Sequence, residues 1–141
     1  MCHLISDKII ITNKKNGKSI TVKSNGNCKS EDVIYAARCK ICDLIYVGET
    51  KDSLKKRFSG HRSDSKNRPE NCDLPEHIHE HGHDFEKDIE VSILKQGFKS
   101  AAERKMQEDK FICLLGTLNP TGLNTKLGQY AKDMYDTYQQ I

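Results

Sequence analysis

Short apolar runs separated by polar turns dominate the first half of the chain. The alternating runs 8–12 and 19–23 flank a turn that contains Gly17, which predicts a β-hairpin. The runs 33–37 and 44–47 are apolar at nearly every position and are bounded by polar residues. We therefore expect two strands that are buried on both faces and pair with each other.

Helical and strand patterns alternate after these runs. Thr50 is placed to cap a helix that runs to about Ser63, with Asp52 in its first turn, where the helix dipole favours a carboxylate. Further along, apolar and polar residues alternate over 89–93 and predict a third buried strand.

Two further helices are expected around and beyond this strand. A loop at 67–73 precedes a short helix that begins near Leu74, and a longer helix is expected at 101–115, ending at Gly116. After the first hairpin, the order is thus strand, strand, helix, short helix, strand, helix. An apolar stripe at helical spacing predicts a terminal helix, formed by Leu127, Tyr130, Met134, Tyr138 and Ile141.

Composition limits the size of the core. The 141 residues are 35% hydrophobic and 30% charged, which favours one domain with a small core. No run approaches the roughly 20 apolar residues that a membrane span requires. The N-terminal residues also lack the layout of a secretory signal, so we expect an intracellular protein with no membrane partner. The six cysteines are then expected to be thiols or metal ligands rather than disulfides.

The net charge of +3 hides a division along the chain. Six lysines and one aspartate give residues 1–30 a charge of +5, and seven basic and two acidic residues give 51–69 the same charge. Residues 70–110 carry eleven acidic and six basic side chains, a charge of −5. Two basic segments are compatible with a phosphate-binding face and equally with ordinary solvated surface, so charge alone leaves a nucleic-acid partner open.

The first expected helix carries a polar pair at the edge of its inward face. Leu54 and Phe58 form the inward stripe, and Arg57 and His61, four residues apart, lie along its edge. Such a pair can belong to a binding site. Alternatively, the arginine covers apolar surface with its stem and forms an ion pair at the surface.

Glu108 is an unexpected residue on the inward face of the 101–115 helix. It falls in the stripe formed by Phe111, Ile112 and Leu115 rather than on the polar side. An unpaired buried charge costs several kcal/mol, so Glu108 should meet a cation. Either Arg104, one turn earlier, or a bound metal ion can supply it.

Cys39 and Cys42 have the two-residue spacing of a zinc knuckle, at the tip of the expected second hairpin. Two more ligands are needed, and four histidines lie between 77 and 83. Spacing leaves two pairs open, His77 with His81 on one helical face, or His77 with His83 across a glycine. The alternative is a solvated histidine-rich helix end beside two buried thiols.

Several of these residues follow one another as in one enzyme family. The motifs are Val33-Ile34-Tyr35, Tyr46-Val47-Gly48, Arg57 with His61, Glu108, and Gly122-Leu123-Asn124. Together they resemble a GIY-YIG endonuclease domain, with Val33 in the place of the first Gly of the family name. More narrowly, the chain is similar to the endonuclease domains of Penelope-like retroelements, through Cys28-Lys29-Ser30, Cys39, Cys42, the run 46–50, His61-Arg62, His77, His83 and the run 117–124.

The resemblance implies a small α+β domain with a three-stranded antiparallel sheet flanked by helices. It divides the chain into an accessory hairpin at 1–27, an endonuclease domain with an inserted zinc site at 28–125 and a C-terminal helix at 126–141. It also implies hydrolysis of DNA phosphodiesters. The expected partners are then DNA and a reverse transcriptase of the same element, and the expected location is the nucleus.

The resemblance also assigns roles to residues near the scissile phosphate. Tyr35 and Tyr46 would line the site, with Tyr35 orienting or deprotonating the attacking water and His61 assisting proton transfer. Arg57 would hold the scissile phosphate and offset the charge that grows on it in the transition state.

The remaining implied roles concern metals and DNA. Glu108 would bind Mg²⁺ or Mn²⁺, and Asn124 would position substrate or a water molecule. His79 and His81 would be surface residues. The implied structural zinc ligands are Cys39, Cys42, His77 and His83. The expected contacts to the DNA backbone are Lys55, Lys56, Arg62 and Lys66.

The leading hypothesis is therefore a metal-dependent, zinc-stabilised DNA endonuclease that nicks target DNA for a retroelement. One alternative is a non-catalytic, zinc-stabilised module that binds nucleic acid and keeps the same fold. A third is an adaptor that binds a partner through the tyrosine-rich terminal helix. The complete set of expected catalytic residues favours catalysis, because a binding module has no need of an inward glutamate such as Glu108.

Overall fold

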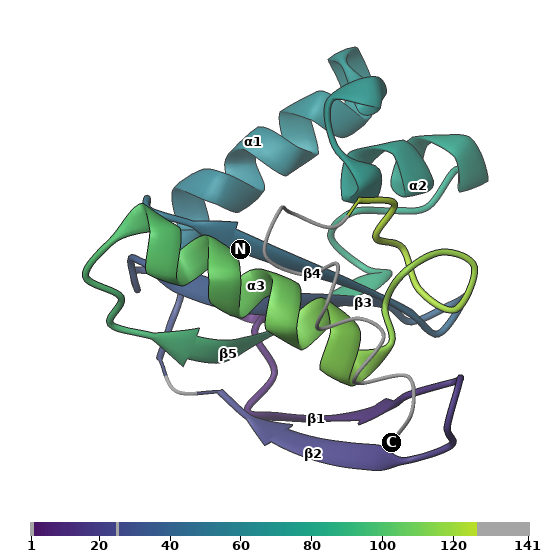
Figure 1. The fold of residues 1–141 in the computed structure, drawn as a ribbon. Helices are drawn as coiled ribbons and strands as arrows, with labels where there is room; N and C mark the ends of the chain where they lie inside the picture. The colour runs from purple at the N-terminus through teal and green to yellow at the C-terminus, as the bar shows by residue number, and fades with distance from the viewer. Residues whose placement is uncertain (1, 25, 127–141) are drawn as a thin grey trace.

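A three-stranded antiparallel sheet forms the centre of the computed structural model, which describes residues 2–24 and 26–126. The strand order is β4-β3-β5, with β3 (Val33–Cys39) in the middle, flanked by β4 (Leu44–Thr50) and β5 (Ile89–Gln96) (Figure 1). Every residue of β3 except Arg38 is buried, which confirms the prediction of a strand covered on both faces. Because β4 lies at the edge, its outer side is accessible to groups that come from both faces of the sheet.

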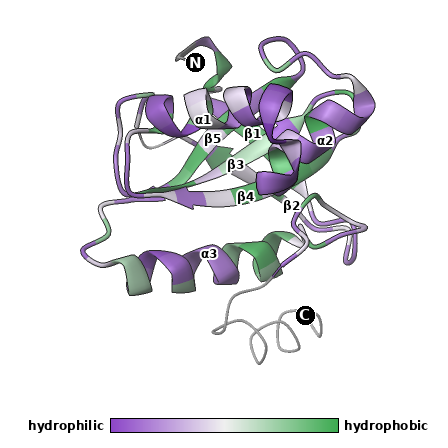
Figure 2. Cartoon of the chain, turned by 90° about the horizontal axis from the view of Figure 1, so that it is seen from above, coloured by the Kyte–Doolittle hydropathy of each residue, from purple (hydrophilic) through white to green (hydrophobic). Residues whose placement is uncertain are grey.

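Helices cover both faces of this sheet. The helices α1 (Leu54–Asn67) and α2 (Asp73–His81) lie on one face, and α3 (Ala101–Leu115) lies on the other (Figure 2). Each face has its own cluster of buried side chains, one with α1 and α2 and one with α3. The α+β architecture expected from the sequence is confirmed.

The N-terminal hairpin packs against the domain on the α3 side. Its strands, β1 (Lys8–Thr12) and β2 (Ser19–Lys23), pair with each other as predicted. Ile9 and Ile11 are buried in the same cluster as Ile112 and Leu115 of α3, whereas Ile10 faces outward. The hairpin therefore contributes to the core of the domain.

The start of α1 differs from the prediction. Ser53 is the cap, because its Oγ accepts a hydrogen bond from the backbone N–H of Lys56 at 3.2 Å. Thr50 instead ends β4, and its Oγ1 accepts from the N–H of Asp52 at 3.1 Å. Asp52 thus precedes the helix, and the first turn of α1 has no acidic residue. The helix also continues beyond Ser63, to Asn67.

The other elements lie close to their expected places. The loop before α2 contains a short 3₁₀ turn, Pro69–Asn71, and another such turn, Cys2–Leu4, lies at the N-terminus. The bounds of α3 are those predicted, and Gly116 ends it in the left-handed conformation. The expected terminal helix lies outside the described residues. No helix among those described is long and apolar enough to cross a membrane.

One cysteine departs from the expectation of free thiols. Cys28 is disulfide-bonded, whereas Cys39, Cys42, Cys72 and Cys113 are free. Cys28 is also buried, beside the start of α1, where its backbone carbonyl accepts a hydrogen bond from the N–H of Lys55 at 2.7 Å.

Candidate active site

The β3–β4 register brings two tyrosines together on the face of the sheet that α1 covers. Tyr35 lies opposite Gly48, and the residue opposite Tyr46 is Ala37, so both tyrosines point to the α1 face. Their ring centroids are 6.2 Å apart. A Cβ at Gly48 would overlap the phenol of Tyr35 and lie 2.8 Å from Cε1 of Tyr46. Only glycine leaves room for both rings at this position.

Tyr35 and His61 share a hydrogen bond beneath α1. The hydroxyl of Tyr35 lies 2.8 Å from Nε2 of His61, and both side chains are almost fully buried. Burial raises the pKa of Tyr35 far above its ordinary value, although Arg57 acts in the opposite direction. Burial, followed by the charge of Arg57, lowers the pKa of His61 to about 3. At neutral pH the pair is therefore a phenol next to a neutral imidazole.

Arg57 presents an unpaired donor to this site. Its Nε is buried and has no hydrogen-bond partner among the described residues. Burial acts to lower the pKa of the guanidinium, but the neighbouring Tyr35, Tyr46 and Cys72 outweigh that effect and raise it, so the group stays charged. A buried N–H of a charged guanidinium without a partner is suited to an anion such as a phosphate.

Glu108 reaches the same region from α3. It is half-buried, and burial, followed by the charges of Glu49 and Asp109, raises its pKa to about 8, although Arg57 opposes this. Arg104 is not its partner, because the Arg104 guanidinium pairs with Glu49 and with Asp32, the latter at 3.0 Å. The alternative of an internal Glu108–Arg104 pair is therefore wrong. The carboxyl of Glu108 suits a hard divalent cation.

Cys72 is a neighbour of the site that the sequence did not indicate. Its Sγ lies 3.2 Å from the hydroxyl of Tyr46. Burial, followed by the nearness of the Tyr35 phenol and the Cys72 thiol, raises the pKa of Tyr46 well above its ordinary value, so this phenol is also protonated at neutral pH. Cys72 lies in a loop far along the sequence from Tyr46, and no spacing pattern connects the two.

Asn124 lies in the site region but binds protein backbone rather than an open space. Its Oδ1 accepts from the N–H of Val47, and its Nδ2 donates to the carbonyl of Val47, both at 2.9 Å. Thr117 also donates to its Oδ1 at 2.7 Å. Through these bonds Asn124 holds the strand between Tyr46 and Gly48, while the second N–H of its Nδ2 is left for the substrate or water expected from the sequence.

A second cluster of polar residues lies at the other end of β3 and β4. The ligand atoms of Cys39, Cys42, His77 and His83 all lie within 4.8 Å of one another. The Nε2 of His77 is buried without a partner among the described residues. Of the two histidine pairs that spacing left open, the structure brings His77 and His83 to the cysteines. Gly82, left-handed with φ of 63°, turns the chain between them.

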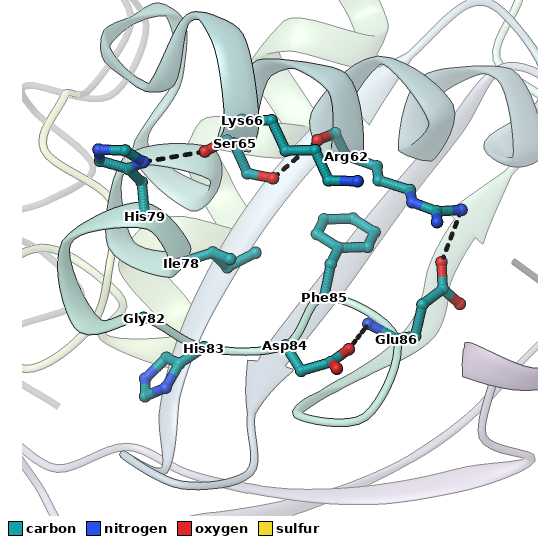
Figure 3. A pocket seen from close by; sticks show the side chains of 10 residues that line it. All are labelled: Arg62, Ser65, Lys66, Ile78, His79, Gly82, His83, Asp84, Phe85 and Glu86. Atoms are coloured by element: carbon teal, nitrogen blue, oxygen red, sulfur yellow. Dashed lines mark hydrogen bonds and ion pairs between the residues drawn. The ribbon is translucent and has the colours of Figure 1, made fainter.

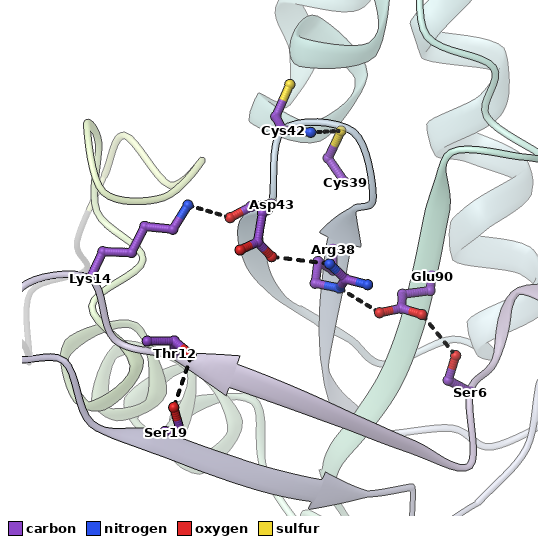
Figure 4. A network of polar contacts seen from close by, with 9 residues as sticks. All are labelled: Ser6, Thr12, Lys14, Ser19, Arg38, Cys39, Cys42, Asp43 and Glu90. Atoms are coloured by element: carbon purple, nitrogen blue, oxygen red, sulfur yellow. Dashed lines mark hydrogen bonds and ion pairs between the residues drawn. The ribbon is translucent and has the colours of Figure 1, made fainter.

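The turn that carries the two cysteines is held by a polar network (Figure 4). Arg38 pairs with Asp43 at 3.0 Å and with Glu90 at 2.5 Å. The N–H of Cys42 donates to Sγ of Cys39 at 3.5 Å, which holds the two ends of the turn together. Burial and two other histidines, His81 and His83, lower the pKa of His77 to about 4, so the ring is neutral and can act as a ligand. This set has the donors and spacing of a structural zinc site.

The expected DNA-contact residues are all exposed on α1. Lys55, Arg62 and Lys66 share one face of the helix, and Lys56 lies on the neighbouring face, 3.8 Å from Asp52. Arg62 pairs with Glu86 at 3.2 Å. Arg62 and Lys66 also border a cavity of about 610 Å³ between α1 and the segment that follows α2 (Figure 3).

Comparisons with known proteins agree with this arrangement. The family model of the GIY-YIG catalytic domain matches residues 31–119. A variant of the catalytic domain of intron endonuclease I-TevI is similar in structure, with a TM-score of 0.54 and 22% identity over 69% of this chain and 95% of that one. The catalytic domain of homing endonuclease I-TevI gives a TM-score of 0.52 and 23% identity over 67% and 97%. A search of curated proteins finds no match.

Replacing Gly48 tests the close approach of the two tyrosine rings. Gly48→Ala is expected to lower the free energy of unfolding by about 1–3 kcal/mol, the usual cost of overpacking. The matched control is Gly60→Ala, because a Cβ at Gly60, in the middle of α1, meets nothing within 4 Å. That change is expected to stabilise the helix by about 0.5–1 kcal/mol. Urea unfolding measures both, and a Gly48→Ala protein as stable as wild type would contradict the packing described.

The lowered pKa of His61 predicts a loss of stability in acid. The unfolded chain takes up a proton on this side chain near pH 6.5, whereas the folded protein does so only near pH 3. The stability that the neutral His61 contributes is therefore fully present above pH 6.5, and it is lost as the pH is lowered towards 3. Between pH 6 and 4.5, wild type should lose about 2 kcal/mol more unfolding free energy than His61→Asn, as measured by urea unfolding. Equal losses in the two proteins would show that His61 is not held neutral.

Proposed function

Because the chain belongs to the GIY-YIG catalytic domain family, we propose that it is a divalent-metal-dependent endonuclease that hydrolyses phosphodiester bonds of DNA. Membership of this family implies DNA endonuclease activity. The observation that carries the proposal is the convergence of side chains from β3, β4, α1 and α3 around the two tyrosines. These side chains are Tyr35, Tyr46, Arg57, His61 and Glu108.

Arg57 binds the scissile phosphate in this proposal. Its unpartnered Nε is the donor that a phosphate oxygen would satisfy, and its charge offsets the negative charge that grows in the transition state. Burial and, after it, the charge of Arg57 keep the pKa of His61 low, and bound phosphate would neutralise part of the Arg57 charge. His61 then becomes a better proton acceptor when the substrate is present.

Tyr35 orients the attacking water and relays its proton. Since burial keeps the phenol protonated, Tyr35 does not act as a phenolate base in the free protein. The proton of the water moves to the Tyr35 oxygen as the Tyr35 proton moves to Nε2 of His61, along the 2.8 Å hydrogen bond. Tyr46, on the neighbouring strand, completes the wall of the site beside the water.

Glu108 would hold the catalytic cation, Mg²⁺ or Mn²⁺, whereas the neighbouring Glu49 is paired with Arg104. When bound, the cation supplies Lewis-acid stabilisation of the phosphate and of the leaving oxygen. Burial, followed by the charges of Glu49 and Asp109, raises the pKa of Glu108, and a divalent cation held by Glu108 would offset these effects.

Zinc is proposed to occupy the cluster of Cys39, Cys42, His77 and His83. The fit rests on four converging ligand atoms and on the buried Nε2 of His77, which has no partner among the described residues. A closed four-ligand site would join the β3–β4 turn to α2 and would stabilise a small core.

The biological setting proposed is that of a retroelement. The basic face of α1 contacts the DNA backbone, with Lys55, Lys56, Arg62 and Lys66 as the contacts, and positions the duplex without reading its sequence. The enzyme nicks target DNA in the nucleus, in partnership with the reverse transcriptase of a Penelope-like element. The support for this setting is the run of sequence motifs from Cys28 to Asn124.

The catalytic role of Glu108 is tested by nicking of supercoiled plasmid in Mg²⁺ or Mn²⁺. Glu108→Gln is expected to lower the nicking rate at least about 100-fold, because a ligand of the cation is lost. The matched control is Glu103→Gln, an exposed glutamate in the first turn of the same helix, which should nick as wild type does. Equal nicking by wild type and Glu108→Gln would contradict the role. DNA binding without nicking by wild type, across several metals, would favour the non-catalytic module.

The zinc site is tested by metal analysis of the purified protein. We expect about one zinc ion per chain, lost in Cys42→Ser and accompanied by a lower thermal unfolding temperature. His79→Ala serves as the control, because His79 is exposed on α2 outside the cluster and should keep the ion. A folded protein that binds no zinc when the metal is supplied would refute the assignment.

A further inference from the structure

The hydroxyl of Tyr46 depends on a single neighbour for its orientation. Within residues 2–24 and 26–126, its one hydrogen bond is to Sγ of Cys72, at 3.2 Å. Cys72 is a free, half-buried thiol that packs against the core cluster on the α1 side.

Cys72 is held at the N-terminal boundary of α2 through its backbone carbonyl, which accepts a hydrogen bond from the N–H of Glu76 at 3.1 Å. The next residue, Asp73, accepts hydrogen bonds from the N–H of Thr125 at 2.9 Å and from its hydroxyl at 2.8 Å. Thr125 follows Asn124, whose amide holds Val47 in β4. The start of α2 is therefore connected to Tyr46 twice, once through the phenol and once through the strand.

We propose that Cys72 is a positioning residue for DNA cleavage, whose thiol fixes the direction of the Tyr46 hydroxyl beside the attacking water. This role rests on the nuclease function proposed above. A phenol O–H rotates readily about its C–O bond, so a single hydrogen bond decides whether the hydroxyl presents its proton or its lone pairs to the site. Burial keeps this phenol protonated, so the proton is there to be directed.

The contact predicts a particular pattern among substitutions. Cys72→Ala removes the partner of Tyr46, whereas Cys72→Ser keeps a side chain that donates and accepts hydrogen bonds. We expect Cys72→Ala to lower kcat for plasmid nicking about 5–10-fold with KM unchanged, and Cys72→Ser to remain within about 2–3-fold of wild type. Cys113→Ala, which removes a buried free thiol of α3, should leave kcat unchanged.

A double-mutant cycle with Tyr46→Phe separates positioning from a general structural effect. If Cys72 acts through the Tyr46 hydroxyl, Cys72→Ala should cause no further loss in the Tyr46→Phe protein. The proposal is overturned if the two losses multiply, if Cys72→Ser is as slow as Cys72→Ala, or if Cys72→Ala nicks as wild type does.

A readout that does not depend on cleavage keeps this proposal distinct from the proposed function. In protein labelled with ¹³C at the tyrosine Cζ, the Tyr46 resonance is the one that disappears in Tyr46→Phe. Cys72→Ala should shift that resonance and leave the Tyr35 resonance in place, and an unmoved Tyr46 resonance overturns the contact. If wild type does not nick DNA, the nuclease function fails together with the role of Cys72 in cleavage, while the resonance still reports whether the contact exists.

Discussion

The pairing of Tyr35 with Gly48 across β3 and β4 is the constraint on which the rest of the site depends. It fixes the register of the two strands, and a slip of β4 by one residue would turn Tyr46 to the opposite face of the sheet, away from Tyr35. The register also sets which side chains of β4 meet α1 and which meet α3. Tyr46 and Gly48 face α1, whereas Val47 belongs to the cluster on the α3 side. This one pairing of strands therefore determines which side chains of β4 contact the helices on each face of the sheet.

Most strands and helices could be predicted from the spacing of apolar residues, because each element buries the side chains on one face. The bounds of α3 could be predicted because an unbroken helical segment lies between Ser100 and Gly116. Ser100 caps the start, and Gly116 ends the helix. The start of α1 could not, because Thr50 and Ser53 are both suitable caps. What decides between them is the length of β4, and pairing with β3 carries that strand as far as Thr50. The capping preferences of Thr50 and Ser53 alone do not reveal how far the pairing of β4 with β3 extends.

The candidate site was predictable where a residue violated its local pattern, and not elsewhere. Glu108 was noticed because a carboxylate on an inward stripe needs a cation, although its supposed partner Arg104 is taken by other carboxylates. Asn124 was found through a sequence resemblance, and its position in the motif could not reveal that its amide binds the backbone of Val47. Cys72 does not break the pattern of apolar and polar residues in its own segment. Its importance arises only because the fold brings it to Tyr46.

The bonds of Asn124 have a consequence for how the molecule avoids associating with itself. An edge strand with unpaired backbone groups is a template for another strand, and β4 is such an edge. Here the N–H of Leu123 donates to the carbonyl of Ile45 at 2.8 Å, and the amide of Asn124 satisfies both backbone groups of Val47. Two residues of a loop thereby do what a fourth strand would do. The strand that carries Tyr46 is closed to β-augmentation along this stretch, so a partner molecule meets its side chains rather than its backbone.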